Sequence, residues 1–99
     1  MTKVTMMMPQ ITNPVEEVLC SKTRIKIIKL LDDLGQLNVS DVAHRLHINY
    51  QEITRHLRIL ENSKIVESRV CGRTRSFRLS GSQRTQAIRK MLEAWERKK

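Results

Sequence analysis

The chain has 99 residues, with 19 Lys and Arg against 10 Asp and Glu, three aromatic residues and two cysteines. A chain of this length holds one domain with one core, and it has no room for a catalytic domain beside a regulatory one. Leu, Ile, Val and Met supply most of the 39% apolar content. The expected core is therefore small and aliphatic, and a partner subunit is expected to complete it.

The net charge of +9 is concentrated in the second half of the chain. Residues 1–50 carry six basic and five acidic side chains, whereas residues 51–99 carry thirteen and five. Fixed cations gain free energy by displacing counterions from phosphates, so this half is expected to bind a polyanion. A generally basic surface is the alternative, but a solvated face usually mixes both signs more evenly.

Nothing in the sequence indicates a membrane or secretory segment. No window approaches 18 consecutive apolar residues, and the methionines near the start are interrupted by Pro9 and Gln10. Residues 1–12 are predicted to be a flexible arm, and residues 13–99 a single domain. We expect a cytoplasmic protein, in which Cys20 and Cys71 are reduced thiols, one a buried small side chain and one in a surface hairpin.

The first half of the domain is predicted to be helical. Asn13 is expected to cap a short helix over residues 14–20, with Pro14 at its first position. A second helix is predicted over residues 22–34, with apolar side chains at three- and four-residue spacing, Ser21 as its cap and Gly35 as its stop. Residues 36–39 form a short extended piece, and a third helix of about two turns is expected to start at Ser40 and Asp41.

The next helix is the most informative segment. Asn49 is expected to accept a bond from the backbone of Glu52, and Glu52 to return one, which is typical of a helix start. Ile53, Leu57 and Leu60 form its apolar stripe. The opposite face carries polar and basic side chains, namely Gln51, Thr54, Arg55, Arg58 and Asn62.

Two strands and a last helix complete the predicted elements. Alternating side chains predict strands over residues 65–70 and 75–79, joined by a tight turn at Gly72. This hairpin carries Arg69, Arg73, Arg75 and Arg78. A helix over residues 83–97 has an apolar stripe that ends at Trp95, and the domain is expected to close, or to dimerise, on that stripe.

The order of these elements predicts a winged helix-turn-helix, a mainly α fold with a small β-hairpin (α+β). The DNA major groove admits one α-helix, and bases are read by side chains near the start of that helix. Arginines of a hairpin suit a minor groove or the adjoining phosphates.

Three segments resemble the ArsR family of bacterial and archaeal winged-helix regulators, over about residues 14–80. Residues 23–31, TRIKIIKLL, are similar to the family's "R-x-x-I-L-x-x-L" helix, and residues 53–60, ITRHLRIL, to its "V-S-R-H-L-x-x-L". Residues 71–79, CGRTRSFRL, look like its "G-R-x-x-x-Y-x-L" wing.

The resemblance implies a homodimer that joins through its terminal helices and binds a pseudo-palindromic DNA site. A terminal helix folded onto its own domain is the alternative reading of the apolar stripe. The expected interface residues are Val15, Val18, Leu19, Ile88, Met91, Leu92 and Trp95.

Metal sensing, which the family resemblance also raises, is not expected. The family's thiolate motif, Cys-Val-Cys-Asp-Leu, falls on residues 38–42, where Asn38 and Ser40 stand in place of both cysteines. The last helix has no histidine, and a site on His44 and His47 lacks a visible third ligand. No metal and no cofactor are therefore predicted. A redox switch between the two cysteines is a weaker alternative than two structural thiols.

We expect a sequence-specific, double-stranded DNA-binding transcriptional regulator, acting as a repressor associated with the nucleoid. No nucleophile–base pair, phosphate loop or carboxylate dyad supports an enzyme. A protein–protein or accessory module of the transcription machinery is the alternative function, and RNA binding is weaker because aromatic stacking platforms are scarce. The expected DNA contacts are Tyr50, Gln51, Thr54 and Arg55 to base edges, His56 and Arg58 to the backbone, and Arg73 and Arg75 to the flanking groove. A structural role is the alternative for His56.

Overall fold

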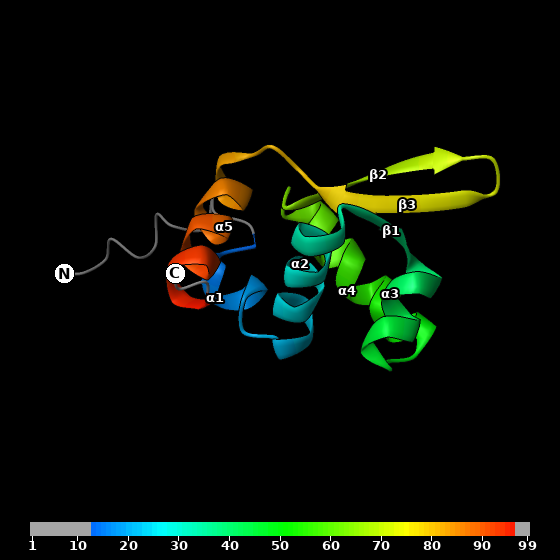
Figure 1. Cartoon of the computed structure of the whole chain (residues 1–99), viewed down its shortest axis with the longest axis horizontal. Helices are drawn as coiled ribbons and strands as arrows, with labels where there is room; N and C mark the ends of the chain where they lie inside the picture. Colours follow the sequence, from blue (N-terminus) through cyan, green and yellow to red (C-terminus); the bar gives the residue numbers. More distant parts are fainter. Residues whose placement is uncertain (1–12, 97–99) are drawn as a thin grey trace, which may run out of the picture.

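A computed structural model describes residues 13–96, with five helices and three strands in that range (Figure 1). The predicted arm over residues 1–12 and the last expected helical residue, Arg97, lie outside the described residues. The elements are α1 (Val15–Val18), α2 (Lys22–Leu34), β1 (Gln36–Asn38), α3 (Val39–Leu46), α4 (Tyr50–Asn62), β2 (Val66–Cys71), β3 (Thr74–Leu79) and α5 (Gln83–Glu96).

The first helix is shorter than predicted, and Asn13 does not cap it. Asn13 has a positive φ of 54°, and its side-chain amide donates to the carbonyl of Asn62, 3.5 Å away at the end of α4. Pro14 takes the N-cap position of α1 without a side-chain bond. The Asn13 side chain therefore links the start of the domain to α4 instead of satisfying the N–H groups of α1.

The prediction for α2 is confirmed at both ends. The Ser21 hydroxyl accepts from the backbone N–H of Arg24, which satisfies one of the free donors of the first turn. Gly35 follows the helix with a φ of 93°, and its N–H donates to the carbonyl of Leu31. Glycine adopts positive φ without the steric cost that a Cβ would bring.

The caps of α3 and α4 place these two helices relative to each other. The Asn38 side chain accepts from the backbone N–H of Asp41 at 2.8 Å, so α3 starts at Val39, before the expected Ser40. The Asn49 side chain accepts from the N–H of Glu52 at 2.8 Å, which confirms the predicted start of α4. The predicted return bond from Glu52 is not formed among the described residues, because its carboxylate lies beside Nε2 of His56, 3.7 Å away. The connection between α3 and α4 turns at His47, whose φ is 58°.

The sheet has three antiparallel strands in the order β1-β3-β2. The predicted hairpin is confirmed to within one residue at each strand end, and Gly72 occupies its turn with a φ of 64°. The extended piece before α3 is a third strand, because Leu37 of β1 pairs with Phe77 of β3. In Figure 1 the β2–β3 hairpin projects beyond the helices as a wing.

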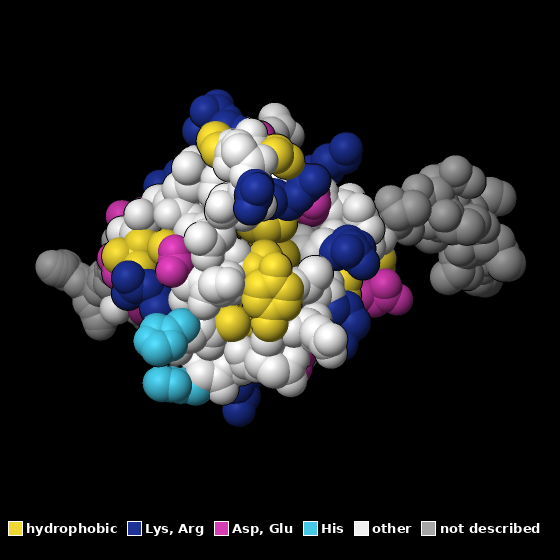
Figure 2. Space-filling view, turned by 90° about the vertical axis from the view of Figure 1, so that its right-hand side faces the viewer, with side chains coloured by type: hydrophobic (Ala, Val, Ile, Leu, Met, Phe, Trp, Pro, Cys, Tyr) yellow, Lys and Arg dark blue, Asp and Glu magenta, His cyan; other side chains and the backbone are white. Residues whose placement is uncertain are grey.

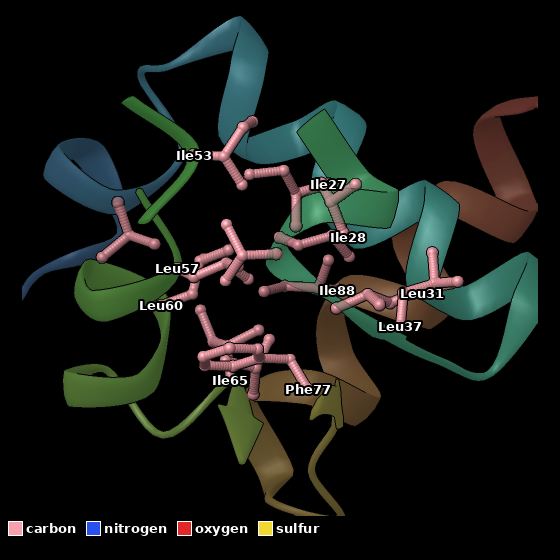
Figure 3. Packing of buried hydrophobic residues seen from close by; sticks show 14 residues of the cluster. Ile27, Ile28, Leu31, Leu37, Ile53, Leu57, Leu60, Ile65, Phe77 and Ile88 are labelled. Atoms are coloured by element: carbon pink, nitrogen blue, oxygen red, sulfur yellow. The ribbon is translucent and has the colours of Figure 1, made fainter. Parts of the chain in front are cut away.

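The core lies between α2, α4 and the base of the sheet (Figure 3). Ile27, Ile28 and Leu31 of α2 are at most 1% exposed and face the apolar stripe of α4. Phe77 closes the core from the sheet, and it is the one aromatic residue among the buried hydrophobic side chains of residues 13–96. Each fully buried side chain of this kind stabilises the fold by about 1.5–3 kcal/mol.

Two ion pairs join the last helix to α2, and Ile88 of the last helix belongs to the core cluster. Arg89 Nε lies 2.9 Å from an oxygen of Asp32, and Lys29 Nζ lies 2.8 Å from an oxygen of Glu96. Among the helices formed by residues 13–96, none is both long enough and apolar enough to cross a membrane.

Candidate nucleic-acid interface

The outer face of α4 is polar and accessible along its first three turns. Its capped start holds the helix in register, so the apolar stripe faces the core while Gln51, Arg55 and Arg58 are exposed. Tyr50 is 55% exposed at the first position. The half-buried Thr54 donates its hydroxyl proton to the Tyr50 carbonyl at 2.9 Å, so toward a ligand this hydroxyl offers lone pairs only.

The arginines of the wing are divided between two faces of the hairpin. Side chains alternate along a strand, and the ladder pairs Val70 with Arg75 and Glu67 with Arg78. Arg75 therefore shares a face with the buried Phe77, the face turned toward α4. Arg78 lies on the opposite face, where its guanidinium is 2.7 Å from the Glu67 carboxylate.

A hollow of about 620 Å³ separates the wing from α4 and the start of α3. Its lining includes Tyr50, Thr54 and Arg58 from α4, and Arg73, Arg75 and Phe77 from the wing. Figure 2 looks onto this end of the molecule, where Lys and Arg side chains lie around a central apolar patch. Three predicted DNA-contacting arginines, one from α4 and two from the wing, thus meet at one concave surface, which suits a polyanionic backbone.

His56 does not lie on this surface, which corrects the expectation that it contacts the DNA backbone. Its side chain points inward because it follows the buried stripe of α4, and it is 8% exposed. Nδ1 lies 2.8 Å from Nη1 of Arg24, and Nε2 lies 3.7 Å from the Glu52 carboxylate. Burial, followed by the charges of Arg24 and Arg55, lowers the pKa of His56, although Glu52 opposes this shift.

Arg24 is the structural residue that the sequence analysis did not single out. It is 8% exposed, and its guanidinium donates to the Val18 carbonyl at 2.8 Å and to the Glu17 carbonyl at 2.9 Å, besides its bond with His56. One side chain therefore joins the end of α1 to α4. The sequence does indicate that Arg24 is buried, because it lies one turn before Ile27 and Ile28 on the buried stripe of α2.

The predicted dimer surface is part core and part exposed. Val18 and Ile88 are 2% and 9% exposed inside the protomer, so they belong to its own core, which corrects their assignment to an interface. By contrast Val15, Met91 and Trp95 are 65%, 44% and 79% exposed. Ile88 of the α5 stripe therefore packs onto its own domain, whereas Met91 and Trp95 of the same stripe remain exposed.

The half-buried Leu19 and Leu92 lie between these two groups and pack against the core. A mainly apolar groove of about 630 Å³ runs between α1 and α5, with Val15, Leu19 and Ala87 among its lining. In Figure 1 these two helices lie at the end of the molecule opposite the wing.

The two cysteines lie in different parts of the fold. Cys20 follows α1 and is exposed, contrary to the expected burial of one thiol, and its thiol donates to the Glu17 carbonyl at 3.2 Å. Cys71 is exposed at the end of β2. Within residues 13–96, no three His, Cys, Asp or Glu side chains are grouped so that they could hold a metal ion.

These features define the class of the protein: a capped, basic helix preceded by a short helix and followed by an arginine-bearing hairpin is a winged helix-turn-helix DNA-binding domain. The family model for bacterial regulatory proteins of the arsR family matches residues 21–68. The arsenical resistance operon repressor of Escherichia coli (strain K12) is 34% identical over 79 residues, which cover 80% of this chain and 68% of the repressor. The chain belongs to the ArsR family of DNA-binding transcriptional regulators.

Solved structures show the same fold. HlyU from Vibrio cholerae N16961 has a TM-score of 0.74 at 23% identity, over 85% of this chain and 89% of HlyU. The homodimeric winged helix-turn-helix DNA-binding domain of Mb0332 from Mycobacterium bovis has a TM-score of 0.77 at 20% identity, over 97% of this chain and 87% of that domain. The predicted fold class is therefore confirmed.

Proposed function

We propose that this chain is a transcriptional repressor that binds a pseudo-palindromic DNA site as a homodimer. The observation that carries the proposal is the meeting of Arg58, Arg73 and Arg75 around one hollow beside the exposed face of α4. Cations from two separate segments of the chain repel one another when they lie close together, unless a polyanion neutralises them. Family membership supports the same function.

The first turns of α4 would enter the major groove. Gln51, Thr54 and Arg55, with Tyr50, are placed to reach base edges, because bases are read near the start of a recognition helix. Arg58 lies one turn further along, where a helix crossing the groove meets the backbone. The wing would then contact phosphates or the adjoining minor groove through Arg73 and Arg75.

The second copy would bind the exposed part of the α1–α5 surface. Val15, Met91 and Trp95 are large apolar side chains that remain in water in the protomer, and burying them on a two-fold partner stabilises a dimer. Such a dimer presents two α4 helices to half-sites about one DNA turn, ~34 Å, apart. The homodimeric state of the Mycobacterium bovis domain supports this arrangement.

We do not propose control by arsenic, although a relative is a repressor of an arsenical resistance operon. At the start of α3, the Asn38 side chain caps the helix by accepting from the Asp41 N–H. Ser40 has a hydroxyl at a position where a soft metal ion would need a thiolate ligand. We expect the protein to act in the cytoplasm, where bacterial DNA lies, and by DNA binding alone with no enzymatic step.

Selection of bound duplexes from a random pool tests this function. We expect a consensus with two-fold symmetry and an affinity that falls steeply with salt, because several phosphates release counterions. An asymmetric consensus would overturn the dimeric mode of binding. A salt-independent or absent affinity would instead favour the alternative, a winged helix that assembles with other proteins.

A further inference from the structure

The guanidinium of Arg75 is held by a chain of hydrogen bonds that leads from the wing to α4. Nη1 of Arg75 donates to the Ser68 hydroxyl at 2.9 Å, and this hydroxyl donates to Oε2 of Glu61 at 2.7 Å. A serine hydroxyl has one proton and two lone pairs, so both bonds form together and in this direction. The chain joins β3, through β2, to the last turn of α4.

We propose that Glu61 and Ser68 are positioning residues that hold Arg75, and with it the wing, at a fixed place beside α4 for contact with a DNA phosphate. This inference rests on the proposed DNA-binding function. It assigns a role to two residues that the sequence pattern does not mark, because neither is basic and neither lies on the predicted recognition face.

The sheet geometry makes this contact possible. Ser68 is paired with Phe77 in the β2–β3 ladder, and Arg75 stands two residues before Phe77. Ser68 and Arg75 are therefore diagonal neighbours on the hairpin face turned toward α4. Phe77 is only 5% exposed, so the core anchors this face, while Glu61 and Arg75 both line the hollow beside α4.

Glu61 lines a surface proposed to face phosphates, and its negative charge by itself would repel them. Its structural role is to accept from the Ser68 hydroxyl, which orients that hydroxyl so that it accepts from Arg75. Arg75 commits one N–H donor to Ser68, and a guanidinium has four further N–H donors. Ordering a long side chain before binding is expected to improve affinity by about 2- to 10-fold.

The opposite face of the wing offers a matched comparison. Glu67 and Arg78 form an ion pair at 2.7 Å, with about half of each side chain exposed (47% and 52%). The pair lies across the β2–β3 ladder on the face turned away from α4. A change at Glu67 therefore removes the same charge as a change at Glu61 and leaves the Ser68–Arg75 contact in place.

Binding of a labelled random-sequence duplex, measured by fluorescence anisotropy over a salt series, tests the proposal because phosphate contacts do not depend on base sequence. Arg75→Ala should weaken binding and lower the salt slope by about one. Ser68→Ala should weaken binding by about 2- to 10-fold and lower the slope in the same direction. The double variant should bind like Arg75→Ala alone, whereas Ser68→Thr, which keeps the hydroxyl, should bind like the unaltered protein.

Glu61→Ala and Glu67→Ala separate positioning from simple charge. If Glu61 acts only by its charge, both variants should bind the duplex more tightly, and Glu61→Ala at least as tightly as Glu67→Ala, because Glu61 lines the hollow proposed to face phosphates. The proposal requires Glu61→Ala to bind more weakly than Glu67→Ala, and thermal unfolding of each variant checks that it is folded.

Unchanged binding by Ser68→Ala, or effects of Ser68→Ala and Arg75→Ala that multiply, would overturn the inference and leave the DNA-binding function standing. A wild-type protein that does not bind the duplex would overturn the proposed function itself.

Discussion

The Arg24 guanidinium donates to two carbonyls at the end of α1 and, at 3.9 Å, to the sulfur of Cys20. It also donates to Nδ1 of His56, which can accept only when the imidazole is neutral. The buried contact between α1 and α4 therefore depends on the protonation state of His56.

This contact predicts a loss of stability in acid. Burial and the charges of Arg24 and Arg55 place the folded-state pKa of His56 below 6.5, its ordinary value, although Glu52 opposes the shift. The folded protein then binds this proton more weakly than the unfolded chain does. The stabilisation is present above pH 6.5 and is lost as the pH falls from there through the folded-state pKa.

Urea unfolding at about pH 7.5 and about pH 5 measures this effect. His56→Gln should lose less of its free energy of unfolding between these conditions than the unaltered protein. His44→Gln, a change at an exposed histidine, should behave like the unaltered protein. Equal acid sensitivity of His56→Gln and the unaltered protein would contradict the role of this group.

Arg55 and Arg73 should differ in the kind of DNA binding that they support. Arg55→Ala is expected to cost about 1–3 kcal/mol on the selected consensus and to relax base preference, because a base-reading contact is lost. Arg73→Ala should weaken consensus and random duplexes alike and lower the salt slope by about one. Equal losses on both duplexes for Arg55→Ala would argue against its reading a base.

The same helix shows, at the scale of an element, why caps matter for recognition. The Asn49 side chain accepts from the backbone of Glu52, and the turn that it fixes carries Tyr50 and Gln51. If this turn frayed, Tyr50 and Gln51 would no longer be held in the positions from which they can reach bases. The cap therefore serves folding and recognition through one hydrogen bond.

Asn49→Ala should lower the free energy of unfolding by about 0.5–2 kcal/mol, the usual cost of a lost N-cap. Asn49→Asp keeps an acceptor and should retain most of the stability. Asn62→Ala makes the same chemical change at an exposed position at the other end of α4 and should alter stability by less than about 0.5 kcal/mol. Chemical denaturation of the three variants measures these free energies of unfolding. An unchanged free energy of unfolding for Asn49→Ala would show that the cap bond does not stabilise the fold.

Across the whole molecule, two surfaces of different chemistry lie at opposite ends. In Figure 1 the wing lies at one end of the molecule, and α1 and α5 lie at the other. The wing carries the exposed Arg73 and Arg75, whereas α1 and α5 expose the apolar side chains of Val15, Met91 and Trp95. A two-fold partner on the apolar end leaves both basic ends free for DNA. This separation lets assembly and DNA binding be tested independently.

Trp95→Ser should convert the proposed dimer to a monomer, because the most exposed large apolar side chain among residues 13–96, at 79%, is lost from the interface. The protomer core does not use Trp95, so thermal unfolding should still show a folded chain. Tyr50→Ser, a change at an exposed aromatic residue of α4, should leave the dimer intact. Sedimentation velocity measures both, and a dimeric Trp95→Ser would place the interface elsewhere.

The sequence by itself determined the elements whose signals are local. The caps at Ser21 and Asn49 act over three residues, and apolar periodicity acts over one or two turns, so α2, α4 and the hairpin were predicted close to their observed bounds. The concentration of arginine in the wing was likewise visible in the chain itself, as was the class of function to which it pointed.

The tertiary structure alone decided which side chains meet. Arg24 and His56 are 32 residues apart in the chain, and β1 pairs with β3 across about 40 residues. Contacts of this range follow from packing, so a local pattern could not decide whether Val18 and Ile88 are buried in their own domain or against a second copy. The opposite faces of Arg75 and Arg78 follow from alternation along the strand, but the contact of Arg75 with Ser68, and through it with Glu61 of α4, depends on the register of β2 against β3.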